Sequence, residues 1–156
     1  MTSAPNEPKV TQTKSAFRMS VSVIVRVDAK PDRIWPLLTN ADDFPRWNST
    51  VTQIEGTIAA GEKIVVKVPI SPDRDFKLKV VECVPEQRMV WADGFAPMFR
   101  GERTYTLTEA DDGSTSFEMT EVFSGLMLPM IAGSLPDFAP SFLTYAADLK
   151  REAQSA

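Results

Sequence analysis

The sequence contains no histidine, and Cys83 is its only cysteine. A disulfide bond within the chain is therefore impossible, and catalytic sites in which histidine activates a nucleophile are excluded. A zinc site would have to consist of carboxylates alone, without the cysteine and histidine ligands that zinc prefers. The sequence also lacks a glycine-rich phosphate-binding loop and a nicotinamide or flavin fingerprint. We therefore expect no metal and no cofactor.

Long apolar segments and clusters of basic residues are missing as well. No segment approaches the ~20 consecutive apolar residues that a membrane-spanning helix requires, and residues 1–16 lack the apolar core of a secretion signal. Lysine and arginine are scattered and the formal net charge is -4, which argues against nucleic acid as a partner. The hydrophobic content of 43% is that of an ordinary globular protein. We expect a cytoplasmic protein without a membrane span, whose oligomeric state the sequence leaves open.

The clearest pattern in the sequence predicts a long helix over residues 137–152. Apolar side chains recur there every three or four positions, which is the spacing of one buried helix face: Phe138, Phe142, Tyr145, Ala146, Leu149 and Ala153. Asp137 is placed to cap the start of this helix. Lys150 and Arg151 lie in its last turn, where positive charges interact favourably with the helix dipole. We expect the rest of the chain to pack around this helix.

Most of the chain before this helix is predicted to form strands. Residues 1–16 are polar, contain two prolines and show no periodicity, so we expect a disordered leader. Alternating valines predict a strand within residues 17–27, and Pro31 then begins a short helix over residues 31–39 that is followed by a second helical turn. Turn residues separate six further predicted strands, over residues 51–56, 63–70, 76–84, 88–93, 99–109 and 114–124. Consecutive strands with tight turns predict an antiparallel α+β sheet.

Four motifs lie along the predicted elements: V-D-A-K-P-D-R-I-W at residues 27–35, F-P-R-W-N at 44–48, V-P-E-Q-R-M-V-W at 84–91 and F-E-M-T-E-V-F-S-G at 117–125. Together with the long helix, they resemble the helix-grip superfamily of START lipid carriers, birch-pollen-type allergens and bacterial polyketide cyclases, also called SRPBCC. The resemblance implies a single domain over residues 17–153. It implies a curved antiparallel sheet of about seven strands wrapped round the C-terminal helix, with two short helices after the first strand. In this superfamily a hydrophobic or amphipathic small molecule binds between sheet and helix, and only some members are enzymes.

The register of the last hairpin can be predicted from its apolar residues. A three-residue loop over residues 111–113, with Gly113 in the left-handed conformation, brings the apolar sets of both strands to the same face. Three pairs then face inward, namely Leu107 with Phe117, Tyr105 with Met119, and Arg103 with Glu121. The hairpin therefore places one arginine and one carboxylate opposite each other on an otherwise apolar face.

Three roles are open for Arg103 and Glu121. The two charges can simply neutralise each other, because a lone buried charge is costly. They can also anchor the polar part of a ligand, or Glu121 can act as a base in catalysis. Burial would raise the pKa of Glu121, whereas the nearby Arg103 would lower it. Tyr105 is a third candidate for a catalytic role, although its ring also suits the core.

We expect the protein to bind a small hydrophobic or amphipathic molecule in a cavity between the sheet and the C-terminal helix. The expected cavity walls are Val66, Leu78, Met89, Trp91, Arg103, Tyr105, Met119, Glu121, Phe123, Phe138 and Phe142. One alternative is an enzyme of the polyketide cyclase or dehydratase type, with Glu121 as the base and Arg103 or Tyr105 stabilising an enolate. Another is an interaction module with a closed cavity that binds a protein. Residues 126–136 are expected to form either a lid or a plain connection.

Overall fold

The computed structural model describes residues 4–155. Within these residues eight strands form one antiparallel sheet: β1 (Lys9–Lys14), β2 (Arg18–Val27), β3 (Gln53–Glu55), β4 (Lys63–Lys67), β5 (Asp75–Val84), β6 (Arg88–Phe95), β7 (Phe99–Glu109) and β8 (Thr115–Ser124). Their order in the sheet is β1-β2-β8-β7-β6-β5-β4-β3. The α-helices are α1 (Pro31–Thr39), α2 (Phe44–Trp47), α3 (Leu128–Ile131) and α4 (Ala139–Gln154), with 3-10 turns at Ala41–Asp43 and Ala132–Ser134.

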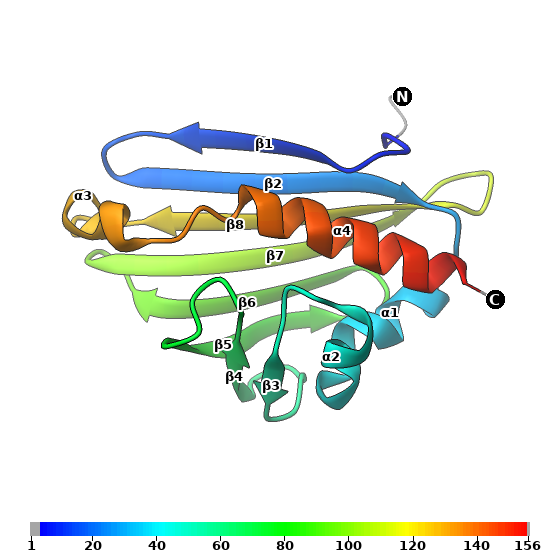
Figure 1. Ribbon diagram of the computed structural model, residues 1–156, viewed down its shortest axis with the longest axis horizontal. Coiled ribbons are helices and arrows are strands. Elements are labelled where there is room, and N and C mark those ends of the chain that lie inside the picture. Colours follow the sequence, from blue (N-terminus) through cyan, green and yellow to red (C-terminus); the bar gives the residue numbers. More distant parts are fainter. Residues whose placement is uncertain (1–3, 156) are drawn as a thin grey trace.

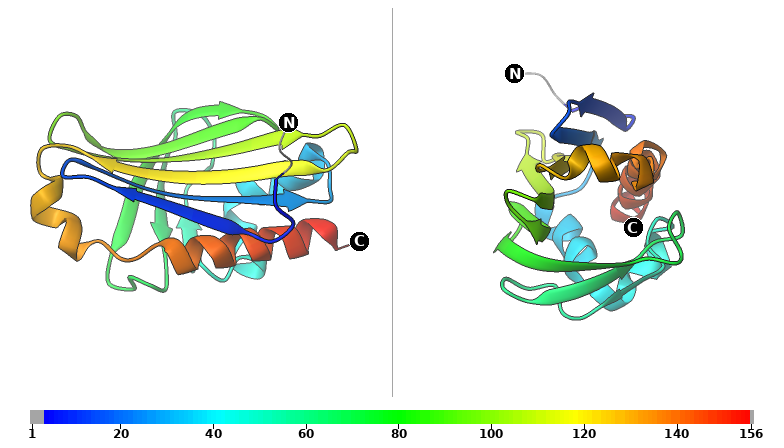
Figure 2. Two further views of the ribbon diagram at one scale, coloured as in Figure 1. Left: turned by 90° about the horizontal axis from the view of Figure 1, so that it is seen from above. Right: turned by 90° about the vertical axis from the view of Figure 1, so that its left-hand side faces the viewer.

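The predicted α+β helix-grip architecture is confirmed. The sheet curves around α4, which lies along its concave face (Figures 1 and 2). The bounds of α1 and β7 agree with the prediction, whereas β4 ends at Lys67 because the chain turns at Val68, whose carbonyl accepts a hydrogen bond from the amide of Ser71. None of the helices within residues 4–155 is long and apolar enough to span a membrane. A single domain over residues 17–153 stays a prediction.

The expectation of a disordered leader is wrong for residues 9–14, which form β1; residues 1–3 lie outside the described residues. Strand β1 pairs with β2 from Lys9 opposite Ile24 to Lys14 opposite Met19. The amide of Arg26 also donates a hydrogen bond to the carbonyl of Pro5. Val10 is the one residue of β1 that packs against the core. One apolar residue in a polar segment gives no periodic signal, so only the pairing with β2 identifies this strand.

Helix α4 presents the predicted apolar face to the sheet. Phe142, Tyr145, Ala146, Leu149 and Ala153 are all buried. The helix begins at Ala139, later than expected, and Asp137 is not its capping residue. Instead, Oδ1 of Asp137 accepts hydrogen bonds from the amide of Ala139 and from Nε2 of Gln12 in β1. Asp137 therefore links the start of α4 to the edge of the sheet.

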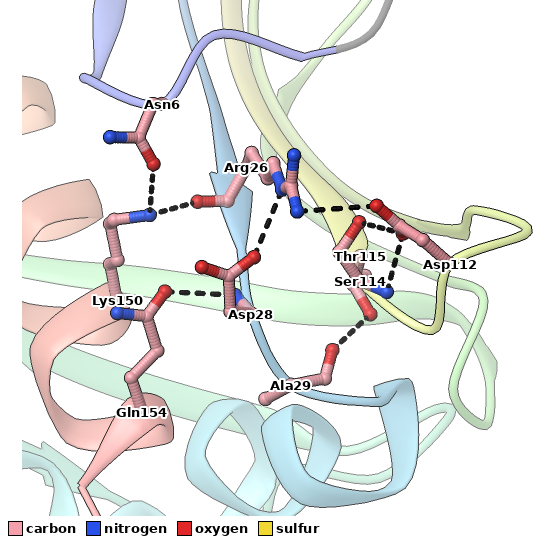
Figure 3. A network of polar contacts seen from close by, with 9 residues as sticks. All are labelled: Asn6, Arg26, Asp28, Ala29, Asp112, Ser114, Thr115, Lys150 and Gln154. Atoms are coloured by element: carbon pink, nitrogen blue, oxygen red, sulfur yellow. Dashed lines mark hydrogen bonds and ion pairs between the residues drawn. The ribbon is translucent and has the colours of Figure 1, made fainter.

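Polar contacts fix the C-terminal half of α4 to the elements around it (Figure 3). Nζ of Lys150 donates a hydrogen bond to the carbonyl of Arg26, and Oε1 of Gln154 accepts one from the amide of Asp28. Arg33 of α1 donates hydrogen bonds to carbonyls at the end of α4, where a helix leaves such groups without internal partners. The buried carboxylate of Asp148 accepts hydrogen bonds from the amide and the hydroxyl of Ser49.

Removal of residues 1–16 should lower the melting temperature, because it removes β1 and uncovers the core beside Val10. We expect a loss of about 1–2 kcal/mol from the apolar area exposed, or several degrees at about 2–4 °C per kcal/mol. In the full chain, Val10→Ala should reproduce part of this loss of stability. Thr11→Ala, on the opposite face of β1, should leave the melting temperature almost unchanged. Thermal unfolding followed by circular dichroism measures all three variants. An unchanged melting temperature after the deletion would show that β1 does not stabilise the fold.

Candidate functional site

A cavity of about 60 Å³, called the inner cavity below, lies between strands β4 to β8 and the residues that precede α4. Its walls are inward-facing side chains of the sheet, Val68 and Arg74 from the connection between β4 and β5, and Leu135 and Phe138. The lining residues are Val66, Val68, Arg74, Phe76, Leu78, Trp91, Asp93, Phe99, Arg103, Glu121, Phe123, Leu135 and Phe138. Most of these side chains are apolar, but four are charged.

The register of the β7–β8 hairpin is the predicted one. Arg103 lies opposite Glu121, and its Nε donates a hydrogen bond of 2.9 Å to Oε1 of the carboxylate. Only 18% of the Arg103 side chain and 11% of the Glu121 side chain are exposed, so water screens this ion pair weakly. The guanidinium also lies 5.1 Å from the centroid of the Phe142 ring, within the range of a cation–π contact. Both charges therefore have partners inside the protein.

Burial is the main influence on the charges of this pair. Burial raises the pKa of Glu121, an effect that the neighbouring Arg103 opposes and that the carboxylates of Asp93 and Glu102 reinforce. Burial is the largest influence on Arg103 and acts to lower its pKa, but the Glu121 carboxylate and the hydroxyls of Tyr105 and Tyr145 together outweigh burial, and the pKa lies above its ordinary value. Arg103 therefore remains a cation, and Glu121 binds a proton more readily than an exposed glutamate does.

Two further charged residues, Arg74 and Asp93, line the inner cavity but were missed in the sequence. Asp93 follows Met89 and Trp91 at intervals of two on β6, so the alternation along this strand could have revealed it. A Cβ atom on Gly101 would lie 2.8 Å from Oδ1 of Asp93, so glycine at this inward position leaves room for the carboxylate. Burial raises the pKa of Asp93, while a hydrogen bond from the Gly101 backbone and the charge of Arg74 act against the rise.

The predicted wall residues divide into three groups. Val66, Leu78, Trp91, Arg103, Glu121, Phe123 and Phe138 line the inner cavity. Met119 and Phe142 line a separate cavity of about 20 Å³, together with Arg103, Phe138 and Tyr145. Met89 and Tyr105 line neither cavity and are buried in the core.

The surroundings of Tyr105 disfavour the catalytic role considered for it. Its ring packs against Trp91 with a centroid distance of 5.0 Å, and 1% of the residue is exposed. Burial raises the pKa of its hydroxyl, so the group stays protonated at neutral pH. Among residues 4–155, the Tyr105 hydroxyl and Nε1 of Trp91 are buried without a hydrogen-bond partner. Of these two residues, only Trp91 lines the inner cavity.

The described residues contain no group of three or more cysteine, aspartate or glutamate side chains positioned to hold a metal ion. Two of the four charged side chains of the inner cavity, Arg103 and Glu121, form an ion pair. Chemically, the guanidinium of Arg103 can donate hydrogen bonds, and the buried carboxylate of Glu121 can exchange a proton.

Comparison with known proteins matches residues 17–151 to the family described as "Polyketide cyclase / dehydrase and lipid transport". No curated protein matches the sequence. Similar solved structures include truncated norcoclaurine synthase from Thalictrum flavum (14% identity, TM-score 0.66, covering 92% of this chain and 99% of that one). A START superfamily protein from Mycobacterium smegmatis is 17% identical, with a TM-score of 0.63 over 86% of this chain and 97% of that one. CalU16 from Micromonospora echinospora is 17% identical, with a TM-score of 0.60 over 94% of this chain and 91% of that one. These likenesses concern the fold.

Replacement of one member of the ion pair should destabilise the protein strongly. Arg103→Met or Glu121→Leu leaves an uncompensated charge in the interior, which costs roughly 3–5 kcal/mol, and the double variant should regain most of this loss. Urea unfolding of the four proteins gives the coupling energy. Arg88 and Glu82 form a matched control, because the same Nε-to-carboxylate contact of 2.9 Å lies there on the surface. Small, additive effects of about the size seen at Arg88 and Glu82 would contradict a buried ion pair.

The half-buried carboxylate of Asp93 should make stability fall as the pH rises. The pKa of Asp93 is raised in the folded protein. Its protonated form therefore contributes fully to the unfolding free energy below the unfolded pKa, and this contribution is lost as the pH rises through the folded pKa. The unfolding free energy of Asp93→Asn should therefore increase relative to wild type from about pH 4 upward. Asp112→Asn should change in the opposite direction, since hydrogen bonds from Ser114 lower the pKa of Asp112. Urea unfolding between about pH 2 and 7 measures both differences, because the change at Asp112 lies below its unfolded pKa of about 4. A constant difference for Asp93→Asn would rule out a raised pKa.

Proposed function

We propose that this chain, which belongs to the polyketide cyclase/dehydrase and lipid transport family, binds a small hydrophobic or amphipathic molecule, with its polar group in the inner cavity. The observation that carries the proposal is the Arg103–Glu121 ion pair in the wall of an otherwise largely apolar cavity. Apolar walls with a few convergent polar groups are typical of small-molecule sites. The wall supplies the affinity of such a site, and the polar groups fix the orientation of the ligand.

The hydrogen-bonding groups at the cavity favour a ligand oxygen. Nε of Arg103 is used by Glu121, but the guanidinium carries further N–H donors beside the cavity. A carbonyl or hydroxyl oxygen can accept a hydrogen bond from these N–H groups.

The charges around the cavity favour an uncharged ligand group. Arg74 and Arg103 supply two positive charges, while Asp93 and Glu121 supply two carboxylates. Because the two signs balance, an added ion would be desolvated without an excess of opposite charge to compensate it, which disfavours both anionic and cationic head groups. The proposed ligand is therefore a hydrophobic molecule that carries a neutral carbonyl or hydroxyl group.

Catalysis at the same site is a second candidate function. The observation that favours it is the raised pKa of Glu121, because a base works best when its pKa is near the pH of the reaction. Glu121 would remove a proton next to a carbonyl group, and the guanidinium of Arg103 would stabilise the resulting enolate. This candidate uses the same ligand class and the same two residues.

A tryptophan placed in the inner cavity should abolish binding. We expect wild type to bind a fluorescent apolar ketone with a stoichiometry near one, and Leu78→Trp to prevent this binding because its side chain fills the cavity. Overpacking should cost no more than about 1–3 kcal/mol. Val81→Trp is the matched control, since Val81 lies on the same strand but is exposed. Fluorescence titration and thermal unfolding measure both variants. Equal binding by Leu78→Trp and Val81→Trp would place the ligand elsewhere.

Glu121→Gln separates the two candidate functions, because glutamine keeps a hydrogen-bond acceptor for Arg103 but cannot act as a base. A carrier should keep its affinity for the ketone within a few-fold. For an enzyme, the exchange of the ketone's α-protons with solvent deuterium, followed by NMR, should be fast with wild type and lost in Glu121→Gln. Slow exchange with both proteins would argue against the enzyme.

A further inference from the structure

The inner cavity is too small to hold a whole ligand of the proposed kind. Its volume is about 60 Å³, whereas pockets for drug-sized molecules measure about 300–1,000 Å³. A carbonyl or hydroxyl group with its nearest carbon atoms fits such a space. The hydrophobic body of the ligand needs a second space that adjoins the first.

A groove on the other side of Phe123, Leu135 and Phe138 offers this space. It measures about 470 Å³ and lies between strands β1 and β2 and residues 135–138, and we call it the β1 groove. Its lining residues are Gln12, Thr13, Lys14, Met19, Ser20, Val21, Phe123, Leu135, Pro136, Asp137 and Phe138. Phe123, Leu135 and Phe138 line both the groove and the inner cavity.

The wall between the two spaces consists of side chains. The rings of Phe123 and Phe138 stack with a centroid distance of 5.7 Å, and neither residue is fully buried. Leu135 and Phe138 belong to the connection between the 3-10 turn Ala132–Ser134 and α4, outside any strand. A rotation of these side chains therefore joins the groove to the cavity without breaking a pair of strands.

The sequence of β1 and β2 gives the groove an apolar floor and a polar rim. By their register, Gln12 and Lys14 face the same side as Val21 and Met19, their partners on β2. Met19 and Val21 present apolar surface beside Phe123, while Gln12 donates a hydrogen bond to Asp137 across the groove. The extended apolar part of a ligand can pack on this floor, and the end of the ligand farthest from the inner cavity would reach the polar rim.

We infer that the β1 groove and the inner cavity are two parts of one binding site for an elongated hydrophobic molecule with a neutral oxygen at one end. The oxygen occupies the inner cavity, and the apolar body passes Phe123 and Phe138 and lies in the groove. This inference rests on the proposed function and extends it to the length and orientation of the ligand. Strand β1, which forms one side of the groove, precedes residues 17–151, the region that matches the family.

Methyl ketones of increasing chain length test the inference, because each methylene buried in the groove should improve the dissociation constant about fourfold. Isothermal titration calorimetry of the full chain with 2-hexanone to 2-dodecanone should show this gain along the whole series. Met19→Trp places an indole in the groove, so the gain should stop after the shorter ketones. Lys14→Trp, at an exposed position of the rim, should stop the gain at longer ketones. Thr11→Trp is the control, since Thr11 faces the opposite side of β1 and does not line the groove.

The possible outcomes separate the inference from the proposed function. If wild type binds the ketones and both groove variants keep its chain-length dependence, the body of the ligand lies elsewhere and the inference is overturned. If wild type binds no ketone of any length, the proposed function fails and the inference fails with it. A chain-length limit in Lys14→Trp but not in Thr11→Trp supports the groove even if Met19→Trp does not fold.

Discussion

The structure depends on one constraint of length: a single helix has to cover the concave face of a sheet whose longest strands are longer than the helix. Helix α4 has 16 residues and is about 24 Å long, whereas β7 has 11 residues and extends over about 36 Å. The buried face of α4, from Phe142 to Ala153, covers one end of the sheet. Side chains and the connection before α4 have to fill the other end, and the inner cavity lies there.

This division explains where the charged residues of the inner cavity occur. Under the middle of α4 the inward positions carry closely packed aromatic rings, as where Phe117 stacks on Tyr145. Toward the uncovered end the inward positions of β6, β7 and β8 carry Asp93, Gly101, Arg103 and Glu121. Charged groups at that end retain partial access to water, which lowers the cost of holding them against apolar walls. The ion pair and the cavity are therefore consequences of the same incomplete cover.

The sequence predicted what depends on alternation and on turn chemistry. The β7–β8 register, with Arg103 opposite Glu121, followed from the parity of the apolar residues and from Gly113, whose φ is 86°. Strand β1 escaped prediction because its stability comes from pairing with β2 and from one side chain, Val10. The expected wall was wrong for Met89 and Tyr105, although both face inward, because parity gives the face of a sheet but not the position of a void along it. Arg74 lies in the connection between β4 and β5, outside the alternating pattern of a strand, so parity could not place it at the cavity.

The two ends of α4 are held in different ways. At the C-terminal end Arg33, Lys150 and Gln154 form directional hydrogen bonds to or from the backbone, which fix both position and rotation. At the N-terminal end the contacts are the Gln12–Asp137 hydrogen bond and the stacked rings of Phe138 and Phe123, which tolerate sliding. Helix α4 is therefore fixed more firmly at its C-terminal end than at its N-terminal end. A ligand that displaces the first turn of α4 can pivot the helix about its C-terminal end, so the volume of the site can change while Leu149 and Ala153 keep their positions in the core.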